Sequence, residues 1–222
     1  MTEDDSMVPR IKRVKKEKKK IKIPVLNILL VLVCSFLLVV ATFVQFDITH
    51  FIIPHDLFSN KALTREDFLY TFSIIPQVPA VLFIVGLLGR RLGITSILIY
   101  ILCGLFLFPV FALGGGVQYF TEFGFGYILA YIAAAVFAGS ILESGFSFKN
   151  ILKAALVGVL TIHVIGITYM LFIVAIKHEG WAFIKGWILA QSILKIAYDY
   201  VLSLVALTVA KYANKFVKYL IY

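Results

Sequence analysis

Charged residues are scarce in this chain of 222 residues. They make up 15% of the sequence, whereas soluble domains average about 25%. Apolar residues account for 61% of the chain, and the mean hydropathy is +0.98. A soluble domain needs polar side chains to cover its surface, and too few are present. The composition therefore excludes a disordered chain, a coiled coil, collagen and a disulfide-rich scaffold, and it predicts that lipid surrounds most of the protein.

Motifs of catalysis and nucleotide binding are also missing. The sequence contains no Walker A motif, no His-Glu-x-x-His, no Gly-x-Ser-x-Gly and no pair of carboxylates inside an apolar run. A membrane-embedded hydrolase needs a nucleophile with its base, two acids or a metal ion. The run Gly114-Gly115-Gly116 is not followed by Lys and Ser or Thr, so it is not a phosphate loop. We therefore expect no enzyme and no cofactor bound by this chain.

Cysteine and potential metal ligands are few. The two cysteines, Cys34 and Cys103, both lie in apolar runs, so we expect two free thiols that behave as small apolar residues. His50, His55 and Asp56 are the one imaginable set of metal ligands. Their spacing matches no zinc pattern, and no fourth ligand is evident. No metal site is expected.

Long apolar runs dominate the rest of the chain and predict an all-α membrane protein with six transmembrane helices. A helical span needs about 20 apolar residues, whereas a transmembrane strand would give alternating segments of about 10. We expect residues 25–210 to form one membrane domain. The predicted spans are Val25–Phe46, Phe68–Leu88 (broken by Pro76 and Pro79), Gly93–Phe111, Gly126–Leu142, Ile151–Ile176 and Lys185–Ala210.

Two connectors differ from simple turns. Residues 47–67 are too polar to cross a bilayer, yet Phe51–Ile53 is too apolar to float free, so we expect this segment to lie partly in the membrane interface. The glycine-rich connector 114–125 carries Gln118, Tyr119 and Glu122. Its glycines permit positive φ. It is therefore either a flexible turn or a lid over a pocket.

The net charge of +9 is distributed unevenly. Nine basic residues lie between Arg10 and Lys22, directly before the first apolar run. If both termini are cytoplasmic, sixteen basic residues lie inside and four outside, as the positive-inside rule requires. We expect a multi-pass protein of the plasma membrane with a disordered basic tail at 1–24 and a second basic cytoplasmic tail at 211–222. The first tail either sets topology or docks an acidic partner, and we expect no nucleic acid partner.

Ionisable residues inside the spans are the candidates for function, because each costs roughly 2.5–3.5 kcal/mol to insert. Lys195 and Asp199 are four residues apart in the last span, so they share a helix face with Gln191 and Ser192. This face is either a self-neutralising ion pair packed between helices or a polar site in which Lys195 meets an anionic ligand. His163, alone in the fifth span, is more typical of a hydrogen bond to a neighbouring helix.

Several short motifs, taken in order, resemble the BioY family. The resemblance covers about residues 70–210. The motifs that carry it are Pro76-Gln77-Val78-Pro79, Gly86-Leu87-Leu88-Gly89-Arg90-Arg91-Leu92-Gly93, Tyr100, Gly104-Leu105, Pro109-Val110-Phe111-Ala112, Gly114-Gly115-Gly116 and Gly124-Phe125-Gly126-Tyr127-Ile128-Leu129-Ala130.

The resemblance implies a six-helix S component of an energy-coupling factor transporter, which binds biotin and works with a membrane coupling subunit and a pair of ATPases that use ATP. In this family an aspartate and a lysine, three residues apart on the last helix, contact biotin. Lys195 matches the lysine, whereas Ser192 stands at the aspartate position. An S component for another small anionic nutrient and a structural membrane protein without a ligand remain the alternatives. The predicted substrate-binding residues are Lys195, Ser192, Asp199, Gln191, Gly115, Gln118, Tyr119 and Tyr127.

Overall fold

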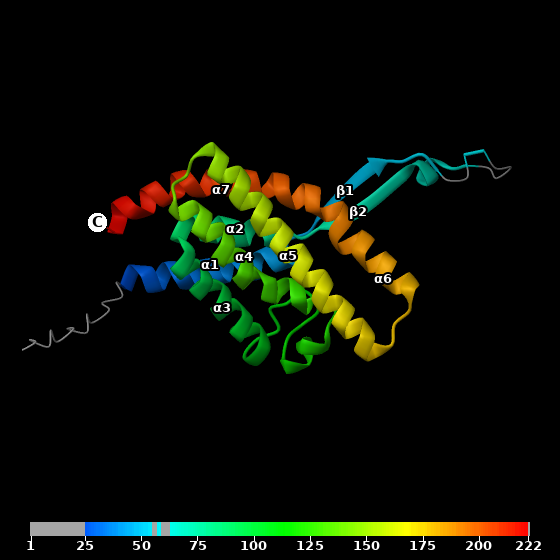
Figure 1. Cartoon of the computed structure of the whole chain (residues 1–222), viewed down its shortest axis with the longest axis horizontal. Coiled ribbons are helices and arrows are strands. Elements are labelled where there is room, and N and C mark those ends of the chain that lie inside the picture. The colour runs from blue at the N-terminus through cyan, green and yellow to red at the C-terminus, as the bar shows by residue number, and fades with distance from the viewer. Residues whose placement is uncertain (1–24, 55–56, 59–62, 222) are drawn as a thin grey trace, which may run out of the picture.

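Helices make up most of the computed structural model, which describes residues 25–54, 57–58 and 63–221. The predicted tail at 1–24 and the residues His55 and Asp56 lie outside the described residues. The elements follow in the order shown in Figure 1. They are α1 (Val25–Phe43), β1 (Phe46–Phe51), η1 (Arg65–Phe68), β2 (Leu69–Ile74), α2 (Gln77–Leu88), α3 (Arg90–Phe106), η2 (Val117–Thr121), α4 (Phe125–Glu143), α5 (Phe148–Lys177), α6 (Trp181–Ile188), η3 (Leu189–Ile193) and α7 (Leu194–Ile221).

The helical membrane fold is confirmed, although the helices differ in length. In the described part of the chain, four helical segments are long and apolar enough to cross a membrane: α1, α4, α5 and the continuous stretch Trp181–Val217. Two further α-helices are shorter, with 12 residues in α2 and 17 in α3. At about 1.5 Å per residue, both are shorter than the hydrocarbon core of a bilayer, and α2 is much shorter.

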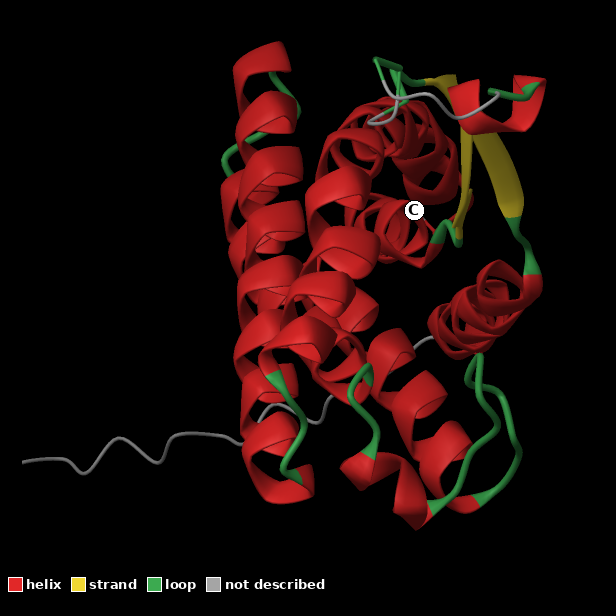
Figure 2. Cartoon of the chain, turned by 90° about the vertical axis from the view of Figure 1, so that its right-hand side faces the viewer, coloured by secondary structure: helices red, strands yellow, loops and turns green. Residues whose placement is uncertain are grey.

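The expected second span, Phe68–Leu88, is wrong in its first half, and the fold is therefore not all-α. Residues 69–74 form β2, which pairs antiparallel with β1 from Phe46↔Ile74 to Phe51↔Leu69. Alternating aromatic and β-branched residues favour a strand here, and Pro76 prevents a helix from starting earlier. Figures 1 and 2 both place the two strands at one edge of the helical bundle, and Figure 1 shows them extending away from the helices.

Helices α4 and α5 pack closely and form much of the core. Ala130, Ala134 and Ala138, spaced every four residues along α4, are fully buried inside the protein. The small-residue ridge on α4 therefore serves internal packing, since small side chains let helix backbones approach each other. On α5, a Cβ atom at Gly166 would lie 2.5 Å from ring atoms of Tyr127. The glycine leaves room for the Tyr127 ring between the two helices.

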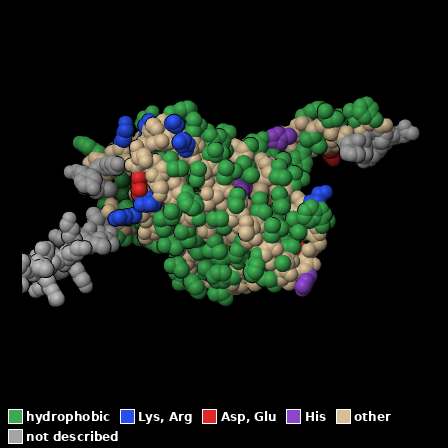
Figure 3. All heavy atoms as spheres, viewed as in Figure 1, with side chains coloured by type: hydrophobic (Ala, Val, Ile, Leu, Met, Phe, Trp, Pro, Cys, Tyr) green, Lys and Arg blue, Asp and Glu red, His purple; other side chains and the backbone are tan. Residues whose placement is uncertain are grey.

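One end of the bundle gathers basic side chains and both described chain ends. The Arg90 guanidinium pairs with Glu143 at 3.0 Å, which joins the start of α3 to the end of α4. The Asn214 amide donates to the Leu87 carbonyl at 2.6 Å, which brings the end of α7 to the same place. Figures 1 and 3 show that α1 begins, α7 ends and most Lys and Arg side chains cluster at this end. The predicted tail at 211–222 continues α7 as a helix through residue 221.

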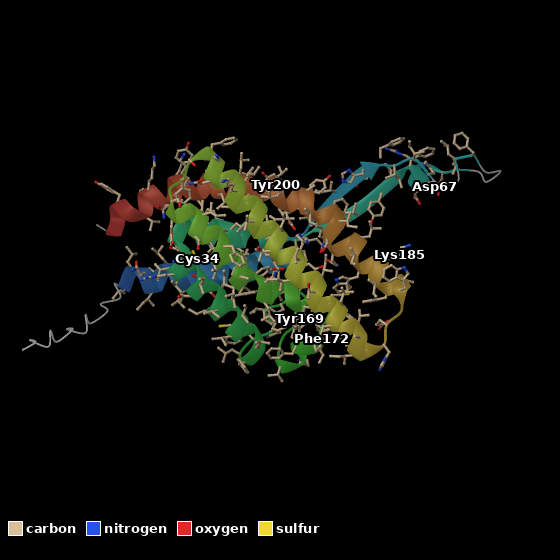
Figure 4. All side chains as sticks on the ribbon, in the orientation of Figure 1. Cys34, Asp67, Tyr169, Phe172, Lys185 and Tyr200 are labelled. Atoms are coloured by element: carbon tan, nitrogen blue, oxygen red, sulfur yellow. The ribbon has the colours of Figure 1, made fainter. Side chains whose placement is uncertain are left out.

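The two cysteines lie on α1 and α3, and the hairpin and α6 lie at the end of the molecule opposite the basic cluster. Cys34 and Cys103 are both free, as predicted, and Cys34 is buried within the bundle (Figure 4). Asp67 lies on the hairpin far from Cys34, and Lys185 lies on α6 at the end opposite the basic cluster (Figure 4). The described molecule thus has a basic end and an opposite end formed by the hairpin, η2 and α6.

Candidate functional site

A cavity of about 270 Å³ opens among α2, the η2 connector, α4, α5 and the stretch from α6 to α7. Its size is slightly below the range of about 300–1,000 Å³ typical of ligand pockets, which suits a small guest. Most of the wall is apolar or aromatic, and a few polar side chains project from different elements. The lining residues are Ile75, Gln77, Val78, Ala112, Leu113, Tyr119, Gly124, Tyr127, Ile128, Tyr131, Ile162, His163, Trp187, Gln191, Lys195 and Asp199.

Lys195 is the cation of this cavity. Its ammonium donates to the Gln191 side-chain oxygen at 2.8 Å, one helical turn earlier. An ammonium group has three donors, and among the described residues Gln191 is the one hydrogen-bond acceptor that Lys195 has. The side chain is half-buried. Lys195 therefore has donors left over for a guest that carries negative charge.

A π-helical segment, Leu189–Ile193, sits where α6 passes into α7 and carries both Gln191 and Ser192. Such segments are rare and often occur at functional sites, because they turn successive side chains in directions that an α-helix would not. Here Gln191 reaches Lys195 along its own helix, while Ser192 points to α4 and α5. The π-helical segment thus directs the side chains of Gln191 and Ser192 toward different partners, although the two residues are adjacent in the sequence.

Asp199 does not pair with Lys195 as the ion-pair interpretation supposed. Its carboxylate accepts from His163 Nε2 at 3.1 Å, and both side chains are nearly fully buried. The other ring nitrogen of His163 is 3.0 Å from Ser192 Oγ, which in turn is 2.8 Å from the Tyr127 hydroxyl. Four residues from three helices therefore form one continuous chain of hydrogen bonds beside the cavity.

A second polar group lies on the other side and was not assigned to the site from the sequence. The Tyr131 hydroxyl donates to Gln77 Oε1 at 2.9 Å. The Gln77 amide donates in turn to Thr42 Oγ1 at 2.6 Å and to the Tyr100 hydroxyl at 3.1 Å. Gln77 stands between two prolines at the start of a short helix, which is the feature of the sequence that marks it. This network joins α1, α2, α3 and α4 around one wall of the cavity.

The indole N–H group of Trp187 is a hydrogen-bond donor at the cavity without a well-aligned acceptor among the described residues. Its indole Nε1 is buried and has no acceptor with hydrogen-bond geometry among the described residues, although the Tyr127 hydroxyl lies near it. A buried N–H group without a partner is costly, so a guest with an oxygen acceptor would relieve it. The Trp187 ring also packs beside Phe123, with centroids 5.5 Å apart, at the edge of the cavity.

The connector after α3 is packed rather than loose. Its backbone is pinned by a hydrogen bond from the Gly116 amide to the Gly104 carbonyl at 2.8 Å. The Tyr119 ring is buried against Phe111, with centroids 4.6 Å apart, and it lines the cavity. Burial raises the pKa of the Tyr119 hydroxyl, so this group stays a neutral donor. The connector closes the cavity with an aromatic side chain.

The predicted site residues fall into three groups. Lys195, Asp199, Gln191, Tyr119 and Tyr127 line the same cavity. Ser192 is fully buried and contacts the cavity wall through Tyr127 and His163. Gly115 and Gln118 are not among the lining residues.

Local geometry explains the last two positions. The Gln118 side chain is exposed and donates to the Gly115 carbonyl at 2.5 Å, so it is used to stabilise the turn. A Cβ atom at Gly115 would lie 2.6 Å from the Gly104 carbonyl oxygen, so this glycine permits close packing of the connector on α3. The sequence interpretation had placed both residues against the ligand.

No cluster of metal ligands occurs among the residues that the structure describes. His50, one of the residues considered for metal binding, accepts or donates a hydrogen bond with the Tyr198 hydroxyl at 2.7 Å. It also stacks on Phe72, with ring centroids 5.4 Å apart. His50 therefore ties the β-hairpin to α7, next to the helix turn that carries Asp199.

The fold and the cavity define a helical membrane protein with an internal cavity lined by a few polar side chains. Comparison of the sequence with known families is more specific: the model of the BioY family matches residues 15–219. The chain belongs to the BioY family, which confirms the resemblance seen in the sequence.

Two known proteins show how this chain compares. It is 35% identical over 104 residues to a probable biotin transporter BioY of Lysinibacillus sphaericus, a match that covers 43% of this chain and 53% of that relative. The match thus spans about half the length of the relative. A crystal structure of the S component for biotin from an ECF-type ABC transporter superimposes with a TM-score of 0.62 at 16% identity. It covers 86% of this chain and 92% of the other, so the two share a fold.

Proposed function

We propose that this protein is the biotin-binding S component of an energy-coupling factor importer and is not itself an enzyme. The observation that carries the proposal is Lys195, a cation in an apolar helix that faces a cavity of about 270 Å³ with Gln191 as its acceptor. Membership of the BioY family and the fold shared with an S component for biotin support the same assignment.

The chemistry of biotin matches the groups around the cavity. Biotin carries a carboxylate, a cyclic urea and a thioether ring. Lys195 receives the carboxylate, because a charge-assisted hydrogen bond is strong where water is excluded. Asp199 and Tyr127 lie at the other polar positions and face the cyclic urea. Tyr119 and the apolar walls cover the thioether ring.

The arrangement in the membrane follows from the two ends of the molecule. The basic end, with Arg91, Lys149 and Lys215 exposed, faces the cytoplasm under the positive-inside rule. Both termini are then cytoplasmic, six helical crossings are made, and the hairpin and η2 face outward. The protein resides in the plasma membrane, and biotin reaches the cavity from outside.

Energy for uptake comes from other subunits, since the sequence contains no nucleotide-binding motif. A membrane coupling subunit with a pair of ATPases uses the ATP, while this chain captures the substrate. Several apolar side chains of α1 are more than half exposed, among them Leu29, Val33 and Phe36. They face lipid or the coupling subunit.

A different small anionic nutrient is the second candidate, because of Ser192. The family carries an aspartate at this position, and here the serine is buried behind Tyr127 and His163. A site without that carboxylate can accept a guest other than biotin. The ligand that co-purifies with the protein distinguishes the two candidates.

Direct binding to the full-length protein in detergent tests the proposal. We expect biotin to bind with nanomolar affinity in titration calorimetry, and Lys195→Ala to weaken binding by roughly tenfold to a hundredfold, the value of a hydrogen bond to a charged group. Lys185→Ala, an exposed lysine on α6, is the matched control and keeps the affinity of the unmodified protein. Absence of binding at micromolar biotin contradicts the proposal.

A further inference from the structure

The hydrogen-bond chain from Asp199 through His163 and Ser192 to Tyr127 has both of its ends in the cavity. Asp199 and Tyr127 line the cavity, whereas Ser192 is fully buried behind it. The three hydrogen bonds measure 3.1, 3.0 and 2.8 Å. Hydrogen bonds have a direction, so the state of one member decides what each end can offer to a guest.

The direction follows from the carboxylate at one end. A carboxylate accepts hydrogen bonds, so the proton shared by Asp199 and the imidazole lies on the side of His163 Nε2. Nδ1 of a neutral ring is then bare and accepts from the Ser192 hydroxyl. Ser192 has used its hydrogen and must accept from Tyr127, whose oxygen lone pairs are left for the cavity.

We propose that His163 is the positioning residue of the site and that, through Ser192, it presents the Tyr127 hydroxyl to the ligand as an acceptor. With the free oxygen of Asp199, the site then shows two acceptors to its guest. The ligands it selects are those with N–H donors, of which a cyclic urea is one class. This inference rests on the proposed function and adds what sets its specificity.

The remaining donor supports the same class of ligand. A cyclic urea has two N–H groups and one carbonyl oxygen. The buried Nε1 of Trp187 has no well-aligned acceptor among the described residues and lies near Tyr127, so it can donate to that carbonyl. Two acceptors and one donor in one cavity match the two donors and one acceptor of the ring.

The first experiment breaks the chain at Ser192 and compares two ligands. Biotin and a biotin methylated on a ureido nitrogen are titrated into the full-length protein. We expect the unmodified protein to prefer biotin by at least about a hundredfold, and Ser192→Ala to reduce this preference about tenfold, roughly the value of one hydrogen bond. Ser203→Ala is the matched control, because Ser203 on α7 is equally buried and has no hydrogen-bond partner among the described residues.

The second experiment repeats the two titrations with His163→Gln, which removes the ring that orients the Ser192 hydroxyl. We expect this variant to lose preference for biotin over the methylated ligand as Ser192→Ala does. Ser203→Ala retains the full preference.

The outcomes separate the inference from the proposed function. If the unmodified protein does not bind biotin, the proposed function fails. If biotin binds but Ser192→Ala and His163→Gln keep the full preference over the methylated ligand, the proposed function stands and the role of His163 is refuted. A purely structural role for Ser192 would lower stability and leave the preference between the two ligands unchanged.

Discussion

The side chains of Lys195 and Asp199 share one face of α7 without forming an ion pair. Lys195 donates to Gln191 at 2.8 Å, and Asp199 accepts from His163 at 3.1 Å. Each charged group thus has its own hydrogen-bond partner, Gln191 for Lys195 and His163 for Asp199. A self-neutralising pair would leave nothing for a guest, whereas this arrangement leaves a cation on one side of the cavity and an acceptor on the other.

Removal of the Lys195 charge should affect only guests that carry a charge. Lys195→Met retains an unbranched apolar stem but has no ammonium, so we expect biotin to bind roughly tenfold to a hundredfold more weakly. Biotin methyl ester lacks the carboxylate and should bind to the variant and to the unmodified protein with similar affinity. Competition calorimetry with both ligands measures this. Equal losses for acid and ester would show that Lys195 acts through packing and not through charge.

Loss of Asp199 should destabilise the protein as well as weaken binding. Asp199→Ala leaves the His163 Nε2 proton buried without an acceptor, which costs about 1–3 kcal/mol. We expect a lower midpoint of thermal unfolding in detergent, followed by circular dichroism. Ser203→Ala should change the midpoint little, because the Ser203 hydroxyl has no hydrogen-bond partner in the described part of the chain. An unchanged midpoint for Asp199→Ala would mean that the pair with His163 contributes nothing to the fold.

Helical periodicity predicted the residues on one face of the last span but not their partners. A spacing of four residues correctly brings Gln191 next to Lys195. The partner of Asp199 is His163, which lies 36 positions away on α5, and no local pattern links them. The π-helical segment also turns Ser192 away from Lys195, because its extra residue per turn shifts the faces of the helix.

Apolar content likewise predicted the long helices but not the hairpin. Leu69–Ile74 contains four apolar or aromatic residues out of six, so apolar content alone extended the predicted second span to Phe68. Strand pairing joins residues that lie far apart in the sequence, from Phe51↔Leu69 to Phe46↔Ile74, so a short sequence window does not detect it. Gln118 is absent from the cavity lining for a local reason that the sequence pattern did not reveal: its side-chain amide donates to the Gly115 carbonyl within its own turn.

A methyl group added at Gly166 should disturb the cavity, because it would push on the Tyr127 ring that lines it. In Gly166→Ala the new Cβ would lie 2.5 Å from the Tyr127 ring, so the ring must shift toward the cavity or α5 must move away from α4. We expect biotin affinity to fall at least tenfold while the protein remains folded. Gly186→Ala on α6 is the control, because a Cβ there meets no atom of the described residues within 4 Å. Equal affinities of the two variants would show that Tyr127 is not held at the ligand by this packing.

Cysteine labelling in intact cells tests the orientation that the basic end implies. In a background with Cys34→Ala and Cys103→Ala, Glu179→Cys lies in the exposed turn between α5 and α6, and Lys215→Cys lies exposed near the end of α7. We expect a membrane-impermeant maleimide to label Glu179→Cys in intact cells and to label Lys215→Cys only after permeabilisation. The reason is that basic flanks remain on the cytoplasmic side. Labelling of Lys215→Cys from outside would invert the molecule, place the cavity toward the cytoplasm and contradict uptake from the exterior.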